Sequence, residues 1–340
     1  MMKIGTLEFD HPIVLAPMED VSDIPFRQIC KERGADIVYT EFTNCEAISR
    51  NVPRALKKIS VTESERPVAI QLYGSNGESL TRAAEIATEL APDFIDINCG
   101  CWVKKVANRG DGAGLLRDLK KFEEVVQSVM RGTSLPVTVK TRLGWDKDDI
   151  VILDVARMLE ANGVQVLTVH CRTRKQGYTG DADWAWLPRI KEAAPDLPLF
   201  ANGDITTPQD VKTVFGLGCD GAMIGRGAIE NPRIFEEAKH FLATGDGLPP
   251  ASYEDRIKLC IRHLKDHVDH RGEGRGVTSF RKHYASYLKG MPNGARLRVW
   301  LMGYTEVAPI EECLLEFMDR LAERSEANYA SDARDHSTAL

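Results

Sequence analysis

The feature that most constrains the fold is a regular alternation of short apolar runs with helical stretches over the first ~230 residues. The apolar runs cover residues 13–18, 37–40, 68–72, 94–98, 137–140, 166–170, 199–202 and 221–224. The expected helices cover about 22–33, 78–90, 119–131, 149–161, a stretch after residue 184, and 208–215. Runs that are apolar almost throughout are typical of a parallel sheet covered by helices. Eight such units predict an α/β fold, a (β/α)8 TIM barrel. A doubly wound sheet is the alternative, but it does not explain why the runs end in matching polar residues.

The β pattern stops near Tyr253, and the rest of the chain has helical spacing. Apolar residues recur there at helical intervals, namely Ile257, Cys260, Ile261, Leu264 and Val268. The sequence therefore predicts a barrel domain at residues 1–244 and a small helical bundle at 251–326, joined by a Gly- and Pro-containing linker. The polar tail at 327–340 is expected to be disordered.

Composition places the chain among ordinary globular proteins. Of its 340 residues, 43% are apolar and 28% are charged. The start of the chain lacks the apolar core of a signal peptide, and no apolar run approaches the ~18 residues of a membrane helix. We therefore expect a cytoplasmic protein with no membrane contact. The eight cysteines are scattered, without paired metal-ligand spacing, so neither a disulfide framework nor a metal site is expected.

Charge is distributed unevenly along the chain. The net charge is −6, but residues 256–298 carry 11 Lys and Arg against 3 Asp and Glu, a local balance of +8. A basic segment on an acidic body indicates an anionic partner, and it falls in the expected helical domain.

Polar residues collect at the ends of the predicted strands, where a barrel places its active site. They are Pro17 and Met18, Gln71, Asn98 and Cys101, Lys140 and Arg142, His170 and Arg172, the turn Asn202-Gly203-Asp204, and the turn Gly225-Arg226-Gly227. The last two are glycine turns on neighbouring strands, which suit a phosphate group, and Arg226 adds a cation.

Three of these side chains fit the ring of a flavin. Gln71 offers a donor and an acceptor together, as a pyrimidine-like ring edge requires. Lys140 would place positive charge beside a reduced, anionic ring, and His170 lies at an equivalent strand end. With the glycine turns, the set indicates flavin mononucleotide (FMN), although another phosphate-bearing ligand has comparable support from this chemistry.

The ordered motifs resemble those of the tRNA-dihydrouridine synthase family over essentially the full chain, and most closely its bacterial B-type branch. They are Leu15-Ala16-Pro17-Met18, Gln71-Leu72, Asp96-Ile97-Asn98 with Gly100-Cys101, Val139-Lys140-Thr141-Arg142, His170-Cys171-Arg172, Ala201-Asn202-Gly203-Asp204, Gly225-Arg226-Gly227 and Arg281-Lys282-His283-Tyr284. No single motif is specific, but the ordered set is.

The resemblance implies an FMN enzyme that reduces the 5,6 double bond of selected tRNA uridines, with NADPH as electron donor. It places FMN on Ala16, Pro17, Met18, Gln71, Lys140, His170, Asn202, Gly203, Asp204, Gly225 and Arg226. It implies that Cys101 donates the proton to uracil carbon 5 after hydride reaches carbon 6. It also implies tRNA binding by a helical domain, in agreement with the basic segment, and we expect a monomer.

Candidate contacts to tRNA are the polar and basic residues around the barrel mouth and on the helical segment. They are Asn98, Lys104, Lys105, Arg142, Arg172, Arg174, Arg281 and Lys282. A solvated charged rim is the alternative interpretation for each basic residue. Of the other cysteines near the mouth, Cys99 is expected to be structural, and Cys171 is a lesser candidate for which packing in the barrel is the preferred interpretation.

The sequence departs from the family pattern in two places. The residue after Cys101 is Trp102, where the family usually has a proline that restricts the preceding residue. Glu19-Asp20 stands after Met18, where small residues are common.

Two other functions are compatible with parts of this pattern. A small-molecule flavin reductase of the dihydroorotate dehydrogenase or ene-reductase kind would explain the flavin set, but not the basic helical segment. The second is a catalytically silent RNA-binding protein that keeps the barrel as a scaffold, and Trp102 is its best support.

Overall fold

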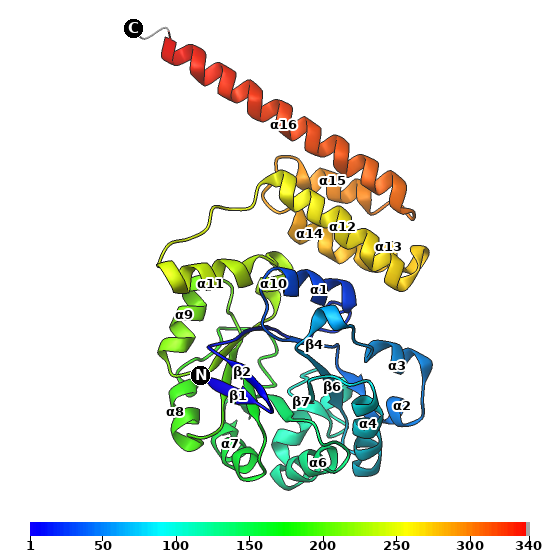
Figure 1. The fold of residues 1–340 in the computed structure, drawn as a ribbon, viewed down its shortest axis with the longest axis vertical. Helices are drawn as coiled ribbons and strands as arrows, with labels where there is room; N and C mark the ends of the chain where they lie inside the picture. Colours follow the sequence, from blue (N-terminus) through cyan, green and yellow to red (C-terminus); the bar gives the residue numbers. More distant parts are fainter. Residues whose placement is uncertain (338–340) are drawn as a thin grey trace. The chain divides into compact units, whose positions relative to one another are not determined.

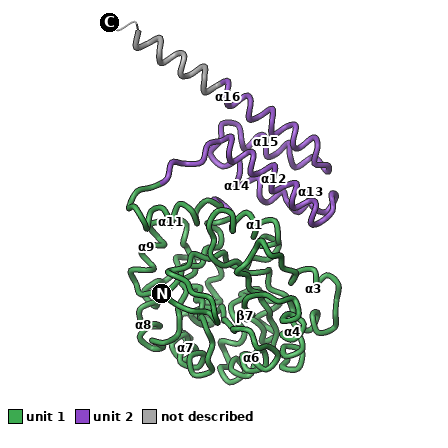
Figure 2. Tube along the Cα trace, in the orientation of Figure 1, with its two compact units in different colours: residues 1–228, 232–247 green, residues 229–231, 248–340 purple. Residues whose placement is uncertain are grey.

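The computed structural model describes residues 1–337, with side chains through residue 323. The chain divides into two compact units (Figure 2): Met1–Ala228 with Pro232–Gly247, and Ile229–Asn231 with Leu248–Leu340. The expected domain limits, 244 and 251, flank the start of the second unit's main segment.

The first unit is a barrel of parallel strands surrounded by helices, as predicted (Figure 1). Its strands follow one path in the order β3-β13-β12-β11-β8-β7-β6-β4, and the short β5 also pairs with β6. They are β3 (Ile13–Leu15), β4 (Val38–Tyr39), β5 (Thr43–Asn44), β6 (Val68–Tyr73), β7 (Phe94–Cys99), β8 (Val137–Arg142), β11 (Val166–His170), β12 (Leu199–Asn202) and β13 (Gly221–Ile224).

Backbone hydrogen bonds bring the two ends of this path together. The N–H of Leu15 donates to the carbonyl of Ile37 at 3.0 Å, and the N–H of Asp36 donates to the carbonyl of Ile13 at 2.9 Å. Both bonds join β3 to the segment that leads into β4. The sheet is thus nearly closed, and the strands' carboxyl ends share one mouth.

Helices follow the strands around the outside of the barrel. They are α1 (Ile24–Glu32), α2 (Cys45–Ser49), α3 (Pro53–Lys58), α4 (Gly77–Glu89), α5 (Lys104–Ala107), α6 (Leu119–Arg131), α7 (Ile152–Ala161), α8 (Trp186–Ala193), α9 (Pro208–Gly216), α10 (Arg226–Glu230) and α11 (Ile234–Thr244). Several of them begin at a capping side chain; for example, the Asp118 carboxylate accepts a bond from the N–H of Lys121 at the start of α6.

An antiparallel hairpin, β1 (Met2–Ile4) and β2 (Leu7–Phe9), fills the amino-terminal end of the barrel. Met2 and Ile4 are buried in one apolar cluster with Phe94, Val166 and Phe200, residues at or near the beginnings of three barrel strands. This hairpin therefore plugs the end of the barrel opposite the mouth.

One predicted helix begins later than expected. Residues 149–151 were expected to start a helix, but Gly144–Asp146 (β9) and Asp149–Ile150 (β10) form a second hairpin, and α7 begins at Ile152. The carbonyl of Leu143 accepts bonds from the N–H groups of both Val151 and Ile152 at 3.1 Å. These bonds hold the chain back toward the end of β8, so the helix cannot start earlier.

The second unit is entirely helical. It consists of α12 (Tyr253–Arg271), α13 (Glu273–Phe280), a 3-10 turn at Arg281–His283, α14 (Tyr284–Tyr287), α15 (Gly294–Leu301) and α16 (Val307–Ser337). All five apolar residues predicted to share a helix face, Ile257 through Val268, are buried in its core. The side chains of residues 327–340, the tail predicted to be disordered, lie outside the described part of the structure, and the disorder stays a prediction.

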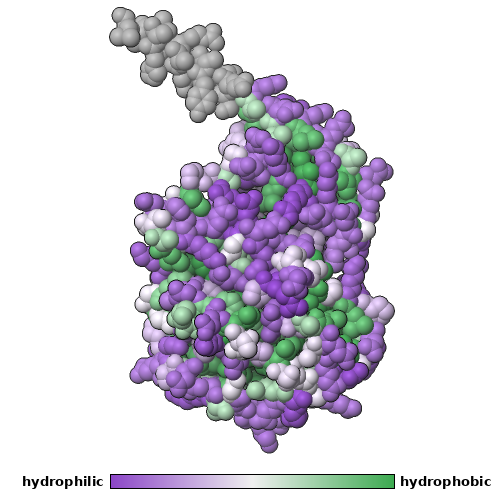
Figure 3. Space-filling model, in the orientation of Figure 1, coloured by the Kyte–Doolittle hydropathy of each residue, from purple (hydrophilic) through white to green (hydrophobic). Residues whose placement is uncertain are grey.

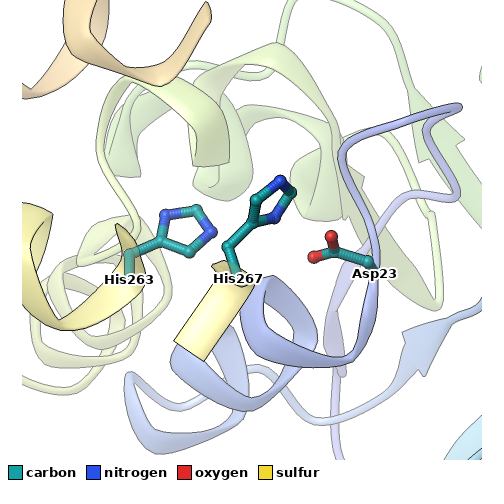
Figure 4. Close-up of side chains that lie close together, drawn as sticks. All are labelled: Asp23, His263 and His267. Atoms are coloured by element: carbon teal, nitrogen blue, oxygen red, sulfur yellow. The ribbon is translucent and has the colours of Figure 1, made fainter. Parts of the chain in front are cut away.

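Three buried histidines also belong to this core. His263 and His267 lie one turn apart on α12 (Figure 4), and the His263 ring is 4.7 Å from the His283 ring between centroids. Nδ1 of His263 lies 3.0 Å from the hydroxyl of Tyr287, and Nε2 of His267 lies 2.8 Å from the hydroxyl of Ser279. These polar contacts let imidazole rings pack among aromatic side chains.

Hydrophilic side chains cover most of the molecular face shown in Figure 3. Among the described residues, no helix combines the length and apolarity needed to cross a lipid bilayer. All eight cysteines lie in that part of the chain and carry free thiols.

Candidate active site

Strand register places the predicted residues in rows around the barrel mouth. Asn98 on β7 is the partner of Lys140 on β8, and His170 on β11 is the partner of both Arg142 and Asn202. Because the strands are parallel, side chains at matched positions near their carboxyl ends surround the same opening. The residues predicted from strand ends therefore lie at matched positions around the barrel mouth.

A chain of hydrogen bonds leads from the barrel interior to the loop that carries Cys101. The Gln71 amide donates to the Asp96 carboxylate at 2.6 Å, and the Asn98 amide donates to the Gln71 carbonyl oxygen at 2.9 Å. The Asn98 carbonyl oxygen then accepts from the backbone N–H groups of Gly100 at 3.1 Å and Cys101 at 2.9 Å. Both amides are thereby oriented, and the cysteine loop is fixed to the end of β7.

Asp96 is the one member of this series of hydrogen-bonded side chains that was not predicted as a site residue. It is fully buried, and the Thr138 hydroxyl donates to its second oxygen. Burial raises the pKa of Asp96 to about 7, although the bonds from Gln71 and Thr138 and the charge of Lys140 oppose the rise. A carboxylate between apolar residues of a buried strand was the sequence signal that could have identified it.

Cys101 is buried but not sealed from the surface. Its relative exposure is 8%, whereas Cys99 and Cys171 are at 0%. Burial raises the pKa of the Cys101 thiol, while the Val103 N–H and the Arg142 charge act in the opposite direction. The thiol is therefore protonated at neutral pH and can act as a proton donor.

Lys140 and His170 take different charges in the same surroundings. Burial, then repulsion from Arg142, lowers the pKa of Lys140 to about 8, so the ammonium form still predominates at pH 7. Burial also lowers the pKa of His170, and the cationic neighbours Arg142, Lys140, Arg172 and Arg226 lower it further. The imidazole is therefore neutral at pH 7. Its Nε2 lies 3.4 Å from an Nη1 of Arg172, which can only donate, so Nε2 accepts in this contact.

The turn after β12 requires glycine at its centre. Gly203 has φ +106°, and a Cβ there would lie 2.7 Å from Cδ2 of His170. Asp204 follows, also with positive φ, and the Asn202 amide donates to the Met223 carbonyl at 2.8 Å. This strained turn lets the backbone approach the His170 ring closely. On the neighbouring strand, a Cβ at Gly225 would only reach ordinary contact, 3.7 Å, with Ala16 and Met18.

Asp204 joins the two arginines nearest these turns. Its carboxylate pairs with Arg172 at 2.6 Å and with Arg226 at 2.9 Å. Burial alone would raise its pKa, but the bonds from Arg172 and the N–H of Ala182 and the charge of Arg226 outweigh this, so the pKa is lowered. The Arg226 side chain remains 51% exposed and covers the Tyr178 ring at 4.9 Å, so it can reach an incoming anion.

The structure separates the predicted tRNA contacts into two groups. Lys104 and Lys105 are exposed on α5, Arg174 lies partly exposed over the Trp145 ring at 4.5 Å, and Lys282 is exposed in the second unit. By contrast, Arg142 and Arg172 are only 2% exposed. Arg281 is half-buried and donates to the Tyr304 carbonyl at 3.2 Å.

The buried Arg142 holds two loops rather than facing solvent. It donates to the carbonyls of Gly100 at 3.0 Å, Thr173 at 3.1 Å and Gly177 at 2.9 Å. Burial lowers its pKa to about 10, so it remains charged at neutral pH. Its guanidinium therefore joins the Cys101 loop to the loop that follows β11.

The acidic pair after Met18 is balanced by a cation. Glu19 pairs with Lys58 at 2.5 Å, and the N–H of Asp20 donates to the Glu41 carboxylate. The first contact offsets part of the negative charge that this departure from the family pattern adds near the mouth.

Comparison with protein families gives one match across most of the chain. Residues 14–322 match the family model described as Dihydrouridine synthase (Dus). The match spans both the barrel unit and most of the helical unit.

Individual proteins agree with this match. The chain is 34% identical to a probable tRNA-dihydrouridine synthase of Rickettsia bellii over 95% of this chain and 100% of the relative. It is 37% identical to tRNA-dihydrouridine synthase B of Pseudomonas aeruginosa over 88% and 90%. Among solved structures, histamine dehydrogenase from Rhizobium sp. 4-9 matches 80% of this chain and 49% of its own, with a TM-score of 0.52 and 14% identity, which supports the barrel fold alone.

Proposed function

We infer the function from this premise: the chain belongs to the dihydrouridine synthase family, and it is a flavin-dependent oxidoreductase that forms dihydrouridine in tRNA. The net reaction adds a hydride to carbon 6 of a uracil ring and a proton to carbon 5. The carbonyl at carbon 4 makes this order chemically reasonable, because it polarises the double bond and leaves enolate-like character at carbon 5.

The finer proposal is that the flavin is FMN, held at the barrel mouth. The donor set fits this group: the Lys140 cation suits a reduced, anionic ring, the Gln71 amide keeps a second N–H and a second lone pair beyond its bonds to Asp96 and Asn98, and Arg226 with the turn at Gly203 suits one phosphate. The half-buried Lys140 ammonium has no hydrogen-bond partner among the described residues, so it is available to a ligand. Bound there, FMN would supply the hydride that uracil carbon 6 accepts.

Cys101 is the proposed proton donor, and its thiol supports the proposal most directly. The Asp96–Gln71–Asn98 chain fixes its loop at the mouth, and burial keeps the thiol protonated. A general acid must carry its proton at the working pH. The half-buried Lys140 lies one strand away, so the proton donor and the proposed flavin contact share the same opening.

The proposal extends to the reductant and the partner. We assign NADPH as electron donor and tRNA as the macromolecular substrate, bound through exposed basic side chains such as Lys104, Lys105 and Lys282. The target uridine must leave its stack to reach Cys101, which costs least in a flexible tRNA loop. We place the protein in the cytoplasm, where tRNA occurs and thiols stay reduced, and we expect it to act as a monomer.

The decisive experiment combines purified protein, FMN, NADPH and unmodified tRNA, followed by mapping of dihydrouridine. We expect a flavin absorbance band that NADPH bleaches without oxygen, and dihydrouridine at defined positions. Lys140→Ala should weaken flavin retention or reduction, whereas Lys3→Ala should change neither, because Lys3 pairs with Glu8 in the plug hairpin. A protein that gains no flavin band when FMN is added would refute the cofactor assignment.

A further inference from the structure

Trp102, which follows Cys101, packs against the loop after β11. The ring faces Gly177, where an added Cβ would lie 3.1 Å from Cε3 and 3.2 Å from Cζ3 of the indole. Gly177 has φ +58°, a conformation that side chains rarely adopt. Glycine at this position therefore provides both the turn and the space that the tryptophan ring occupies.

Tyr178 extends this contact. Its ring meets Trp102 edge to face at 5.4 Å between centroids and 76° between planes. The same ring lies under the guanidinium of Arg226 at 4.9 Å and within 6.2 Å of the His170 ring. An aromatic pair of this geometry contributes ~0.5–1.5 kcal/mol beyond its buried area. Trp102 thus links the cysteine loop to the part of the mouth that carries the two glycine turns.

The same two loops are joined from inside the barrel by Arg142. Its bonds to the carbonyls of Gly100 and Gly177 end one residue before Cys101 and one residue before Tyr178. The cysteine loop, residues 100–103, is therefore held to residues 173–180 on two sides. The buried guanidinium of Arg142 holds it on the inner side, and the Trp102 indole, which is 37% exposed, holds it on the outer side.

We propose that Trp102 is a positioning residue for the Cys101 thiol. By packing on Gly177 and Tyr178, it restrains residues 100–103 from outside, in place of the restraint that a proline at position 102 would impose through its own ring. The restraint keeps the thiol aligned with the mouth and limits the local opening of its loop. Its effect on turnover rests on the proposed proton-donor role of Cys101, but the restraint itself does not.

Cysteine alkylation measures this restraint without turnover. Iodoacetamide reacts with full-length protein, and mass spectrometry of peptides follows each cysteine separately. We expect Trp102→Ala to accelerate alkylation of Cys101 by about 2- to 10-fold, the factor by which losing one aromatic pair shifts a local opening equilibrium. Cys99 and Cys171, which are fully buried, should keep their slow rates and report any general unfolding.

Matched variants make the comparison specific. Trp102→Phe should restore most of the protection, because a smaller aromatic ring still contacts Tyr178. Tyr178→Ala should have an effect similar to that of Trp102→Ala. The double variant should add little, because each single variant already removes the contact between the Trp102 and Tyr178 rings. Trp186→Ala on α8, which removes an indole stacked with Arg189 elsewhere on the barrel, should leave Cys101 unchanged.

Kinetics separate positioning from direct tRNA contact. A positioning role predicts that Trp102→Ala lowers kcat for uridine reduction, with little change in the KM for tRNA or in the rate of flavin reduction by NADPH. Unchanged Cys101 alkylation with a raised KM for tRNA would overturn the inference, and so would failure of Trp102→Phe to protect the thiol. Faster alkylation in Trp102→Ala, together with full activity in Cys101→Ala, would support positioning while rejecting the proton-donor proposal.

Discussion

Cys99 and Cys101 are two residues apart, yet their surroundings suit different roles. Cys99 is fully buried at the end of β7, whereas Cys101 retains slight exposure beside the mouth. If Cys101 donates the proton, Cys101→Ala should bind FMN and tRNA and accept electrons from NADPH, but form dihydrouridine ~10²–10⁴-fold more slowly. Single-turnover oxidation of the reduced enzyme by tRNA measures this step.

Cys99→Ala is the matched control for this prediction. It removes a thiol of the same loop region without touching the mouth, so its dihydrouridine rate should stay close to wild type. Full activity in Cys101→Ala, or loss of activity in Cys99→Ala alone, would show that the wrong cysteine has been assigned.

Asp96 gives stability a defined dependence on pH. Its pKa in the folded protein is about 7, above the ordinary value of 3.8, so the folded state holds a proton that the unfolded chain releases. Between about pH 4 and pH 7 this group therefore lowers the free energy of unfolding as pH rises, by ~1.4 kcal/mol per unit and ~4 kcal/mol in all. Below pH 4 the carboxyl is protonated in both states, and above pH 7 it is ionised in both, so its contribution is constant there.

Asp96→Asn removes this titration and tests it. Asparagine is neutral at every pH, like the protonated carboxyl that folded wild type holds below pH 7, so the stability of the variant lacks this dependence on pH. Urea unfolding at a series of pH values should show the stability of the variant rising relative to wild type between pH 4 and pH 7. A difference between the two proteins that stays constant across this range would contradict the shifted pKa.

At the scale of elements, periodicity was enough to predict the barrel strands and their order. Each strand is buried on both faces, so its apolar run is visible without knowledge of its neighbours. The β9–β10 hairpin was missed because it depends on bonds to the carbonyl of Leu143, a contact made only after β8 has its place. Local pattern thus sufficed where burial is uniform and failed where a tertiary bond determines the start of a helix.

The candidate site follows the same division. Strand position predicted which side chains meet at the mouth, because parallel strands place their ends together. It could not show that Arg142 and Arg172 are buried, since their burial depends on how the loop at residues 173–180 folds over them. Tyr178 has no sequence signal at all, because its role depends on the ring of Trp102 and the guanidinium of Arg226 beside it.

A buried ion pair joins α1 to the segment before β6. Nε of Arg27 lies 2.5 Å from the Glu65 carboxylate, and both side chains are at most 1% exposed. Arg27 also donates to the carbonyls of Ser22 and Ser60. Glu65→Gln leaves the guanidinium without its counter-charge, so we expect a loss of ~3–5 kcal/mol in the free energy of unfolding. Urea unfolding measures this loss.

The exposed pair of Arg82 and Glu85 provides the comparison. Both side chains are about half exposed, so Glu85→Gln should change stability by less than ~1 kcal/mol. Equal effects of Glu65→Gln and Glu85→Gln would mean that burial does not govern the strength of the first pair.

For the whole molecule, charge is divided between an acidic barrel and a basic helical segment. Binding of tRNA should weaken linearly with the logarithm of salt concentration, with a slope set by the number of phosphate contacts. Lys282→Gln should reduce the steepness of this slope by about 1 if that lysine contacts a phosphate. Fluorescence anisotropy titrations with labelled tRNA at several salt concentrations measure the slope.

Lys3→Gln serves as the control for charge alone. It removes one exposed positive charge from the plug hairpin, where Lys3 pairs with Glu8, and should leave the slope unchanged. Identical slopes in wild type and Lys282→Gln would remove that lysine from the proposed tRNA surface.

The plug at the amino-terminal end of the barrel also has a consequence for the order of events in a catalytic cycle. Met2 and Ile4 fill that end, so under the proposed function tRNA and NADPH would both enter by the mouth. A tRNA bound there would exclude a dinucleotide, and the reductant would then deliver its electrons and depart before the tRNA arrives. Initial rates measured against NADPH at several fixed tRNA concentrations should therefore give parallel double-reciprocal lines, whereas converging lines would require both reactants on the enzyme together.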